Sequence, residues 1–177
     1  MLIQETKMSS ANFNKIVSHV WPGATYMHMD AEGASGGIAT MWNLYSMMGV
    51  EVWKDRNFII IDFQTSIQHW GLINIYASNN NVGRKETYDK LARILETMKD
   101  KKLMCMGDFN TPLYHSKKLG GNRDYPESLQ DLNDFIRRMD FIDVELRGNP
   151  FTWTNNRKGR DLIQVRLDRL MVTGNWN

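Results

Sequence analysis

The chain has 177 residues, 42% of them hydrophobic and 24% charged, which is the composition of one ordinary globular domain. Six Trp, six Tyr and seven Phe exclude a disordered chain, and a net charge of +2 excludes a strongly basic protein. No apolar run approaches the roughly 20 residues that a membrane helix requires. Its single cysteine, Cys105, excludes an internal disulfide, and Glu5 and Lys7 interrupt the apolar segment that a signal peptide requires. We therefore expect an intracellular protein of the nucleus or cytoplasm that is not secreted and has no membrane partner.

The sequence has no repeat, no low-complexity tract and no linker-like shift in composition, so we expect a single domain over residues 1–177. It begins with an apolar segment, Met1–Gln4, that is typical of the end of a buried strand. Ser9 or Ser10 can cap a helix that stops at Trp21. The apolar positions of this helix, at helical spacing, are Phe13, Ile16, Val17 and Val20. Five strands are expected next, over Thr25–Met29, Ile38–Trp42, Val50–Trp53, Phe58–Phe63 and Ile67–Ala77. We expect Gly33 and the pair Gly36-Gly37 to form a hairpin turn.

The second half of the sequence carries two amphipathic helices. The clearer one, Arg84–Lys99, places Tyr88, Leu91, Leu95 and Met98 on one stripe, and the other spans about Glu127–Arg138. Strands are expected at Lys102–Met106, Phe141–Val144, Phe151–Thr154 and Val165–Val172. Because runs of consecutive strands separate the helices, the pattern favours an α/β (α+β) layered sandwich of two packed mixed β-sheets flanked by helices.

Acidic and amide side chains follow several of these strands. Asp108 and Asn110 come directly after a buried strand, and residues i and i+2 of an extended segment point the same way, so we expect the two to face one cleft. A carboxylate there suits Mg²⁺, which takes one or two carboxylates, several waters and a substrate phosphate. The same residues equally fit an Asx turn, and spacing alone leaves this alternative open. No His or Cys pair has zinc-ligand spacing, and we expect His28 and His115 to be exposed.

Six strings of the sequence together resemble one enzyme superfamily. They are LIQETK (Leu2–Lys7), GASGGIATMW (Gly33–Trp42), NIYASN (Asn74–Asn79), GDFN (Gly107–Asn110), FTWTN (Phe151–Asn155) and RLDRL (Arg166–Leu170). In this order, spread across nearly the whole chain, they resemble the endonuclease/exonuclease/phosphatase superfamily. Within it, the chain is similar to the apurinic-endonuclease-like domain of plant LINE (non-LTR) retrotransposons.

The resemblance implies a DNA-nicking endonuclease that hydrolyses phosphodiesters with Mg²⁺ or Mn²⁺ as its cofactor. It implies that Glu5, together with Asp108, binds the metal. It assigns catalytic roles to Tyr76 on the scissile phosphate, Asp108 on the attacking water, Asn110 on the transition state and Asp168 as the partner of a catalytic histidine. Substrate-binding roles are implied for Asn79, Trp153, Asn155 and Asn156.

Six basic and two acidic side chains lie between Arg147 and Leu170. The resemblance implies that the basic ones bind the DNA backbone, largely without sequence specificity. The family pattern also includes an N-terminal strand bearing an asparagine and a C-terminal strand with a Ser-Asp-His triplet, which this sequence lacks. We therefore expect a domain truncated at both ends, with weak or lost activity and possible self-association through exposed sheet edges. Two alternatives remain: a catalytically dead remnant that binds nucleic acid or protein weakly, and a phosphodiesterase or phosphatase acting on another phosphate ester.

Overall fold

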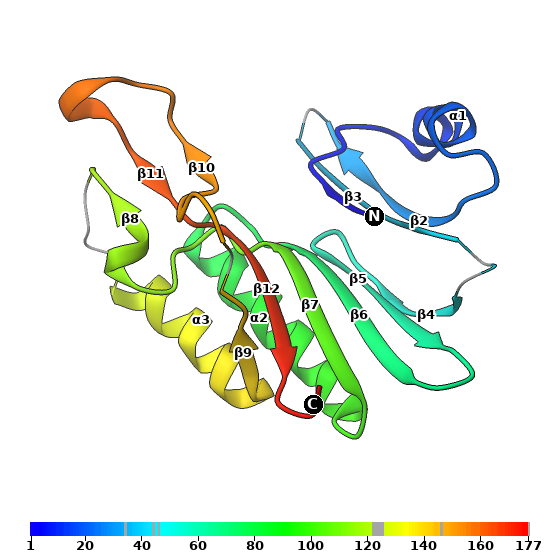
Figure 1. Cartoon of the computed structure of the whole chain (residues 1–177). Coiled ribbons are helices and arrows are strands. Elements are labelled where there is room, and N and C mark those ends of the chain that lie inside the picture. Colours follow the sequence, from blue (N-terminus) through cyan, green and yellow to red (C-terminus); the bar gives the residue numbers. More distant parts are fainter. Residues whose placement is uncertain (34, 44, 46, 122–125, 146, 177) are drawn as a thin grey trace. The chain divides into compact units, whose positions relative to one another are not determined.

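The computed structural model describes residues 1–33, 35–43, 45, 47–121, 126–145 and 147–176 (Figure 1). The chain divides into two compact units. The N-terminal unit comprises Met1–Tyr76 and Asp100–Gly107, and the C-terminal unit comprises Ala77–Lys99 and Asp108–Asn177. Over the described ranges, none of the helices combines the length and the apolar character that crossing a membrane requires.

The N-terminal unit contains two sheets. One has the order β1-β3-β2, formed by β1 (Leu2–Gln4), β3 (Ser35–Trp42) and β2 (Thr25–Glu32) in antiparallel pairs. The other has the order β4-β5-β6-β7, formed by β4 (Met48–Lys54), β5 (Phe58–Gln64), β6 (His69–Tyr76) and β7 (Lys102–Asp108). The expected strands of this region are therefore confirmed, most of them one to three residues longer than the apolar runs that predicted them.

The two sheets of the N-terminal unit pack against each other through alternate residues. Ile59, Ile61 and Phe63 of β5 lie in one buried cluster with Ile38 and Trp42 of β3. The ring of Phe63 contacts that of Trp42 edge to face, with centroids 5.6 Å apart. Because side chains alternate along a strand, residues two apart in β5 share the face that is turned to the other sheet.

Ser9 caps the N-terminus of helix α1 (Ser10–Val20): its hydroxyl accepts a hydrogen bond from the Asn12 amide. Phe13 and Val17, one turn apart, pack on Ala39 and Met41 of β3. The prediction that Ile16 and Val20 also belong to the buried face of this helix is wrong, because their side chains are 41% and 69% exposed. A helix that covers a sheet of only three strands buries a single narrow stripe.

Gly36 and Gly37 lie inside β3, at φ of +82° and +83°, and the hairpin turn lies at Gly33, so the expectation that the pair forms the turn is wrong. Their carbonyls accept the amides of Lys7 and Thr6. A Cβ on Gly37 would lie 2.2 Å from Thr6 Oγ1. These glycines therefore allow the segment that follows β1 to run directly against β3.

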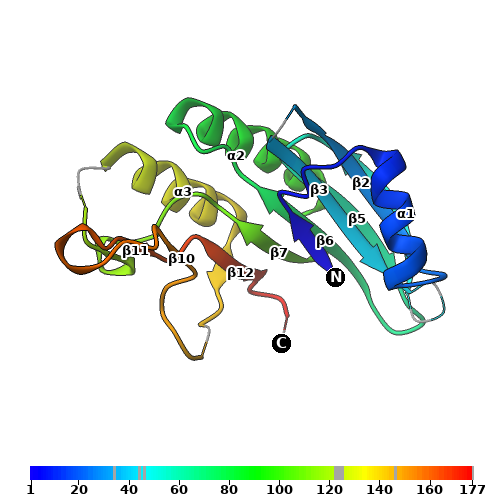
Figure 2. The same ribbon diagram turned by 90° about the horizontal axis from the view of Figure 1, so that it is seen from above.

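The C-terminal unit is built on two helices, α2 (Asn81–Leu95) and α3 (Pro126–Met139), which lie side by side (Figures 1 and 2). The rings of Tyr88 and Phe135 stack between them, with centroids 5.4 Å apart. Short 3-10 helices are η1 (Glu96–Met98), η2 (His115–Lys117) and η3 (Gly159–Asp161).

The strands of the C-terminal unit form two antiparallel groups. One pairs β9 (Phe141–Asp143) with β12 (Asp168–Thr173), and the other has the order β10-β11-β8, from β10 (Trp153–Thr154), β11 (Gln164–Val165) and β8 (Lys118–Leu119). The single strand expected over Val165–Val172 is two strands, interrupted at Arg166 and Leu167. Both units thus combine β-sheets and helices, and the expected α/β layered fold class is confirmed.

His28 is buried, and the expectation that it is exposed is wrong. Its ring stacks on Phe13 with centroids 4.4 Å apart, Nε2 lies 3.1 Å from Thr6 Oγ1, and Nδ1 lies 3.3 Å from Ser10 Oγ. Burial lowers the pKa of His28, and the opposing effect of Asp30 is smaller. The folded chain therefore favours the neutral imidazole.

The free energy of unfolding should fall as the pH drops below about 6.5, the pKa of an unfolded histidine. A base whose pKa is lowered by folding binds its proton more readily in the unfolded chain, so acid removes stability that is fully present above pH 6.5. Urea unfolding between pH 7 and pH 5 should give a steeper loss for the wild type than for His28→Phe. The exposed His115→Phe is the matched control; equal slopes for the wild type and His28→Phe would contradict the assignment.

Candidate active site

The segment that follows β7 is a tight turn. Asp108 is the last residue of β7, and Asn110 adopts the left-handed conformation at φ +50°. The backbone amide of Asn110 donates to Asp108 Oδ1 at 2.7 Å. This is the Asx turn that the sequence left open, so the expectation of an extended segment over residues 108–110 is wrong.

Two hydrogen bonds join this turn to the loop after β6. Asn110 Nδ2 donates to the Ala77 carbonyl at 2.7 Å, and the Ala77 amide donates to the Asp108 carbonyl at 2.8 Å. We call this pair of bonds the Ala77 clamp. Asn79 is exposed two residues further along the same loop. The structure therefore brings Asn79, Asp108 and Asn110, which the sequence analysis selected separately, onto two connected loops.

Helix α2 supports both loops from one face. Arg84 is buried, and its Nη1 donates to the carbonyls of Ser78 and Asn79 at 3.2 and 2.6 Å. One turn later, the buried Tyr88 hydroxyl donates to the Phe109 carbonyl at 2.7 Å. Tyr88 lies on the apolar stripe predicted for this helix, whereas Arg84 was not predicted as a site residue. The available signal was a charged residue that extends that stripe by one turn.

Arg84 places a buried positive charge near the turn. Burial lowers the pKa of its guanidinium, while Tyr88, Asp131 and Asp108 raise it in that order. Among the residues that the structure describes, its buried Nε finds no hydrogen-bond partner. A positive charge held below these loops favours the approach of an anion such as a phosphate.

Asp168 begins β12 next to the same turn. The amide of Phe109, which follows Asp108, donates to the carbonyl of Leu167, which precedes Asp168, at 3.0 Å. The backbone next to Asp108 is therefore bonded directly to the backbone next to Asp168. The amides of Leu167 and Asp168 both donate to Thr152 Oγ1 at 3.0 Å. Three segments far apart in the sequence, residues 77–80, 108–111 and 167–168, are therefore joined in a single hydrogen-bonded assembly.

Glu5 and Tyr76 lie in the N-terminal unit, on neighbouring elements. Gln4 Nε2 donates to Asn74 Oδ1, and the buried Asn74 amide in turn donates to the Ala39 carbonyl and to Thr40 Oγ1. Glu5 directly follows Gln4, and Tyr76 lies two residues after Asn74, so the bond between Gln4 and Asn74 places both candidates near it in the sequence. Buried amides that satisfy each other across two sheets fix the register of both strands.

Glu5 has the donor chemistry of a ligand for a hard divalent cation. Its backbone is left-handed at φ +55°, its side chain is half exposed, and Oε1 lies 3.2 Å from Lys7 Nζ. Within the described part of the chain, no group of three or more His, Cys, Asp or Glu side chains could hold a metal ion. Magnesium needs only one or two carboxylates and retains several waters, so this donor set suits Mg²⁺ or Mn²⁺ better than zinc.

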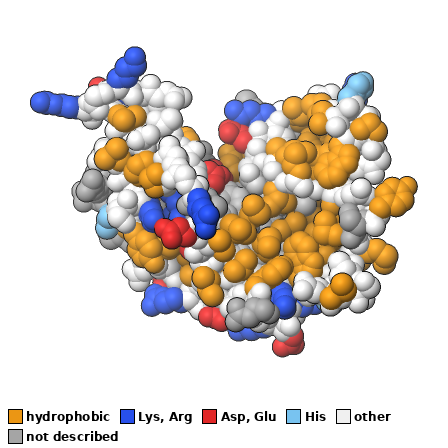
Figure 3. Space-filling model, in the orientation of Figure 1, with side chains coloured by type: hydrophobic (Ala, Val, Ile, Leu, Met, Phe, Trp, Pro, Cys, Tyr) orange, Lys and Arg blue, Asp and Glu red, His pale blue; other side chains and the backbone are white. Residues whose placement is uncertain are grey.

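The hairpin of β10 and β11 carries the remaining candidates. Trp153 is 46% exposed, and Asn156 is exposed with φ at +56°. Asn155 uses its side chain within the hairpin: Oδ1 accepts the amides of Arg157 and Ile163, and Nδ2 donates to the Asp161 carbonyl at 2.8 Å. Its observed contacts therefore shape the loop. Basic side chains project from the end of this hairpin (Figure 3).

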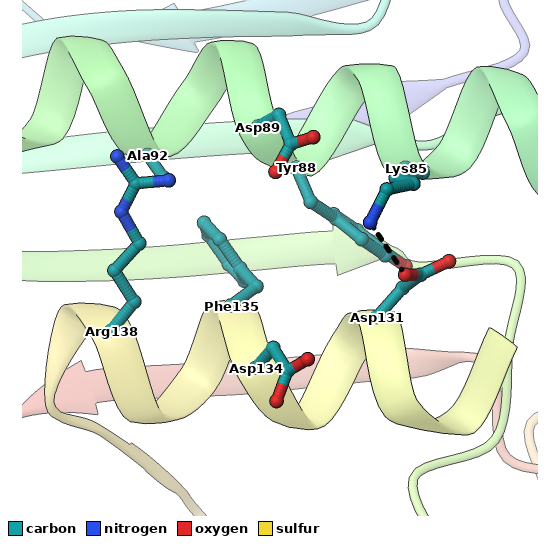
Figure 4. A pocket seen from close by; sticks show the side chains of 8 residues that line it. All are labelled: Lys85, Tyr88, Asp89, Ala92, Asp131, Asp134, Phe135 and Arg138. Carbon is teal, nitrogen blue, oxygen red and sulfur yellow. Dashed lines mark hydrogen bonds and ion pairs between the residues drawn. The ribbon is translucent and has the colours of Figure 1, made fainter. Parts of the chain in front are cut away.

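A separate hollow of about 150 Å³ lies between α2 and α3 (Figure 4). Asp89, Asp131 and Asp134 line it, together with Lys85 and Arg138. Lys85 is paired with Asp131 at 3.1 Å. None of the side chains selected from the sequence as catalytic or substrate-binding lines this hollow.

No protein-family model matches the sequence. Several solved structures are similar to it at low sequence identity. The endonuclease domain of TRAS1, a telomere-specific non-LTR retrotransposon, has a TM-score of 0.68 at 13% identity, over 96% of this chain and 81% of that domain. The Xenopus laevis APE2 catalytic domain has a TM-score of 0.72 at 14% identity, over 98% of this chain and 73% of the other. D. rerio TDP2, complexed with a single strand DNA product, has a TM-score of 0.64 at 13% identity, over 97% and 69%.

These likenesses show that the chain has the apurinic-endonuclease-like α/β fold. The fold that the six sequence strings implied is thereby confirmed. Identities of 13 and 14% carry the architecture alone, so the chemistry must be argued from the chain's own residues.

Replacing Asn110 should measure the strength of the Ala77 clamp. Asn110→Ala loses the side-chain bond to Ala77 and places in the left-handed region an alanine, which tolerates that conformation less well than asparagine, so urea unfolding should show a loss of about 2 kcal/mol. Asn110→Gly is the matched control, since it adopts that conformation freely and should lose only about 1 kcal/mol. Equal losses for both variants would show that the left-handed turn is not retained.

Proposed function

We propose that this chain is a metal-dependent phosphodiesterase that nicks DNA, of the type found in non-LTR retrotransposons. The observation that carries the proposal is the hydrogen-bonded assembly of Asp108, Asn110 and the start of β12 at Asp168. A buried cation, Arg84, supports it from below. The fold shared with the TRAS1 endonuclease domain and the APE2 catalytic domain agrees with this chemistry.

In the proposed reaction, a water molecule attacks the phosphorus of a phosphodiester. As the new P–O bond forms, the P–O bond to the leaving sugar oxygen breaks, and this oxygen takes up a proton from solvent. Glu5 would hold the divalent ion, which would supply positive charge to the phosphate oxygens. Asp108 positions the attacking water and accepts its proton. Asn110 Nδ2 carries two N–H groups, one of which donates to Ala77, and the other donates to the developing phosphorane. Tyr76 donates its phenolic proton to the scissile phosphate.

The remaining residues bind or position the nucleic acid. Asn79 and Asn156 are exposed amides that can donate to backbone phosphates, and Trp153 offers a half-exposed ring for stacking on a base or sugar. Asn155 acts through the loop that it holds together. Asp168 would be the carboxylate that orients a catalytic histidine, the role that the family resemblance assigns to it.

A second candidate function is a binding module without catalysis. The observation that favours it is the bond from the Asn110 amide to Asp108 Oδ1, because a carboxylate that closes an Asx turn has a structural role without any reaction. The same phosphate chemistry would also fit hydrolysis of another phosphate ester.

A supercoiled-plasmid nicking assay separates these functions. With Mg²⁺ or Mn²⁺ the wild-type chain should nick the plasmid, and EDTA should abolish the reaction. Asp108→Asn keeps an oxygen to accept the Asn110 amide but cannot accept a proton from water, so the rate should fall about 10²- to 10⁴-fold. Asp100→Asn, on an exposed residue, is the matched control. Nicking that survives Asp108→Asn in full would show that another site, or a contaminant, is responsible.

DNA binding should depend on salt through the basic hairpin. Arg157, Lys158 and Arg160 are exposed, and each phosphate contact contributes about 0.9 to the slope of log K against log salt. The combined change of these three residues to Gln should lower that slope by about 2 to 3 in fluorescence anisotropy titrations of duplex DNA.

The matched control changes three exposed lysines outside the hairpin, Lys15, Lys54 and Lys99, to Gln. It removes the same charge, and the slope should change little. If both triple variants lower the slope equally, the affinity comes from overall charge, and the hairpin is not the binding element.

A further inference from the structure

A second cavity in the C-terminal unit, of about 220 Å³, lies away from the hollow between α2 and α3. The segment after β9 lines it with Glu145, Asn149 and Thr152, and Lys117 and Arg166 line it from η2 and from the break between β11 and β12. Arg166 is buried, whereas Glu145, Asn149 and Thr152 are exposed, so the cavity opens to solvent and has a buried guanidinium in its lining.

Among the described residues, a single carboxylate pairs with two buried guanidinium groups next to this cavity. Arg166 Nη2 lies 3.1 Å from Asp143 Oδ1, and Arg169 Nη1 lies 2.9 Å from Asp143 Oδ2, so two guanidinium groups share one carboxylate. Their side chains are only 6% and 0% exposed. Among the described residues the Nε atoms of both have no hydrogen-bond partner. An excess cation in the protein interior is costly unless an anion compensates it.

Further donors accompany the Arg166 guanidinium. Lys117, another residue of the cavity lining, forms no ion pair with any residue that the structure describes. The Thr152 hydroxyl accepts two backbone amides, from Leu167 and Asp168, so its own proton remains to be donated. Glu145 is the one acidic side chain in the lining, and it is exposed.

We propose that this cavity binds a phosphate group through Arg166, Lys117 and Thr152. A guanidinium, an ammonium and a hydroxyl together match the oxygens of a phosphate, and the bound anion would balance the charge that Asp143 leaves uncompensated. Building on the proposed function, the phosphate belongs to the DNA backbone. Because Thr152 holds the amides of Leu167 and Asp168, a phosphate bound there contacts the hydrogen-bonded assembly that carries Asp168.

The first arm of the test uses inorganic phosphate and needs no nuclease activity. In a titration followed by ¹H–¹⁵N NMR, phosphate should shift the amide signals of Leu167 and Asp168, and sodium chloride at equal ionic strength should not. Lys117→Gln should weaken this binding about tenfold, the loss expected for one charge-assisted contact. Lys99→Gln, on an exposed lysine outside the cavity, should bind like the wild type. If these signals do not move, or if Lys117→Gln binds phosphate as tightly as the wild type, the site is refuted.

The second arm identifies the source of the phosphate. Anisotropy titrations with duplex DNA should show weaker binding for Lys117→Gln than for Lys99→Gln, and inorganic phosphate should compete with DNA for the wild type more strongly than for Lys117→Gln. Equal DNA affinities of the two variants, with phosphate binding still lost in Lys117→Gln, would refute the backbone source. Neither arm measures cleavage, so failure of the nicking assay leaves the phosphate site to be judged on its own.

Discussion

The Ala77 clamp is the constraint on which the candidate site of the C-terminal unit depends. A loop that follows a buried strand must satisfy its own backbone groups, and here the amide and carbonyl of Ala77 are satisfied by the Asp108 carbonyl and the Asn110 side chain. The same turn accepts a bond from the Tyr88 hydroxyl and donates one to Leu167. Hydrogen bonds that the fold requires thereby bring two acids and an amide onto adjoining segments.

Buried positive charge is the second property of this unit. Arg84 lies beneath the two loops, and Arg166 and Arg169 share Asp143 behind the start of β12. Burying a guanidinium is unfavourable unless carbonyls, carboxylates or a bound anion solvate it. Such cations give a chain with a net charge of only +2 a local excess of positive charge in this unit.

Periodicity predicted the strands and helices well, because apolar residues at a spacing of two or of 3.6 have few other uses. It failed where a single residue serves two segments. His28 alternates correctly along β2, yet its burial depends on Phe13, Thr6 and Ser10, which lie outside that strand. The positive φ of Gly36 reflects the path of the chain after β1, and no local pattern encodes that path.

The candidate site was predictable only in part, because some of its residues depend on contacts that local sequence patterns do not encode. Asp108 and Asn110 were found through strings of residues, and the sequence also contained the Asx turn as an alternative. Arg84 was missed because a cation within an apolar stripe is usually a solvated side chain. Its role depends on two carbonyls, those of Ser78 and Asn79, that only the folded loop presents.

Metal-dependent hydrolysis at this site requires a divalent cation at Glu5, and the most direct test is to locate that cation. Crystals soaked in Mn²⁺ and measured at a wavelength where manganese scatters anomalously should show a peak at the Glu5 carboxylate, within about 2.0–2.2 Å of an oxygen. Crystals of Glu5→Gln should lose that peak. Manganese bound at other positions, with none at Glu5 in the wild-type protein, would contradict the claim.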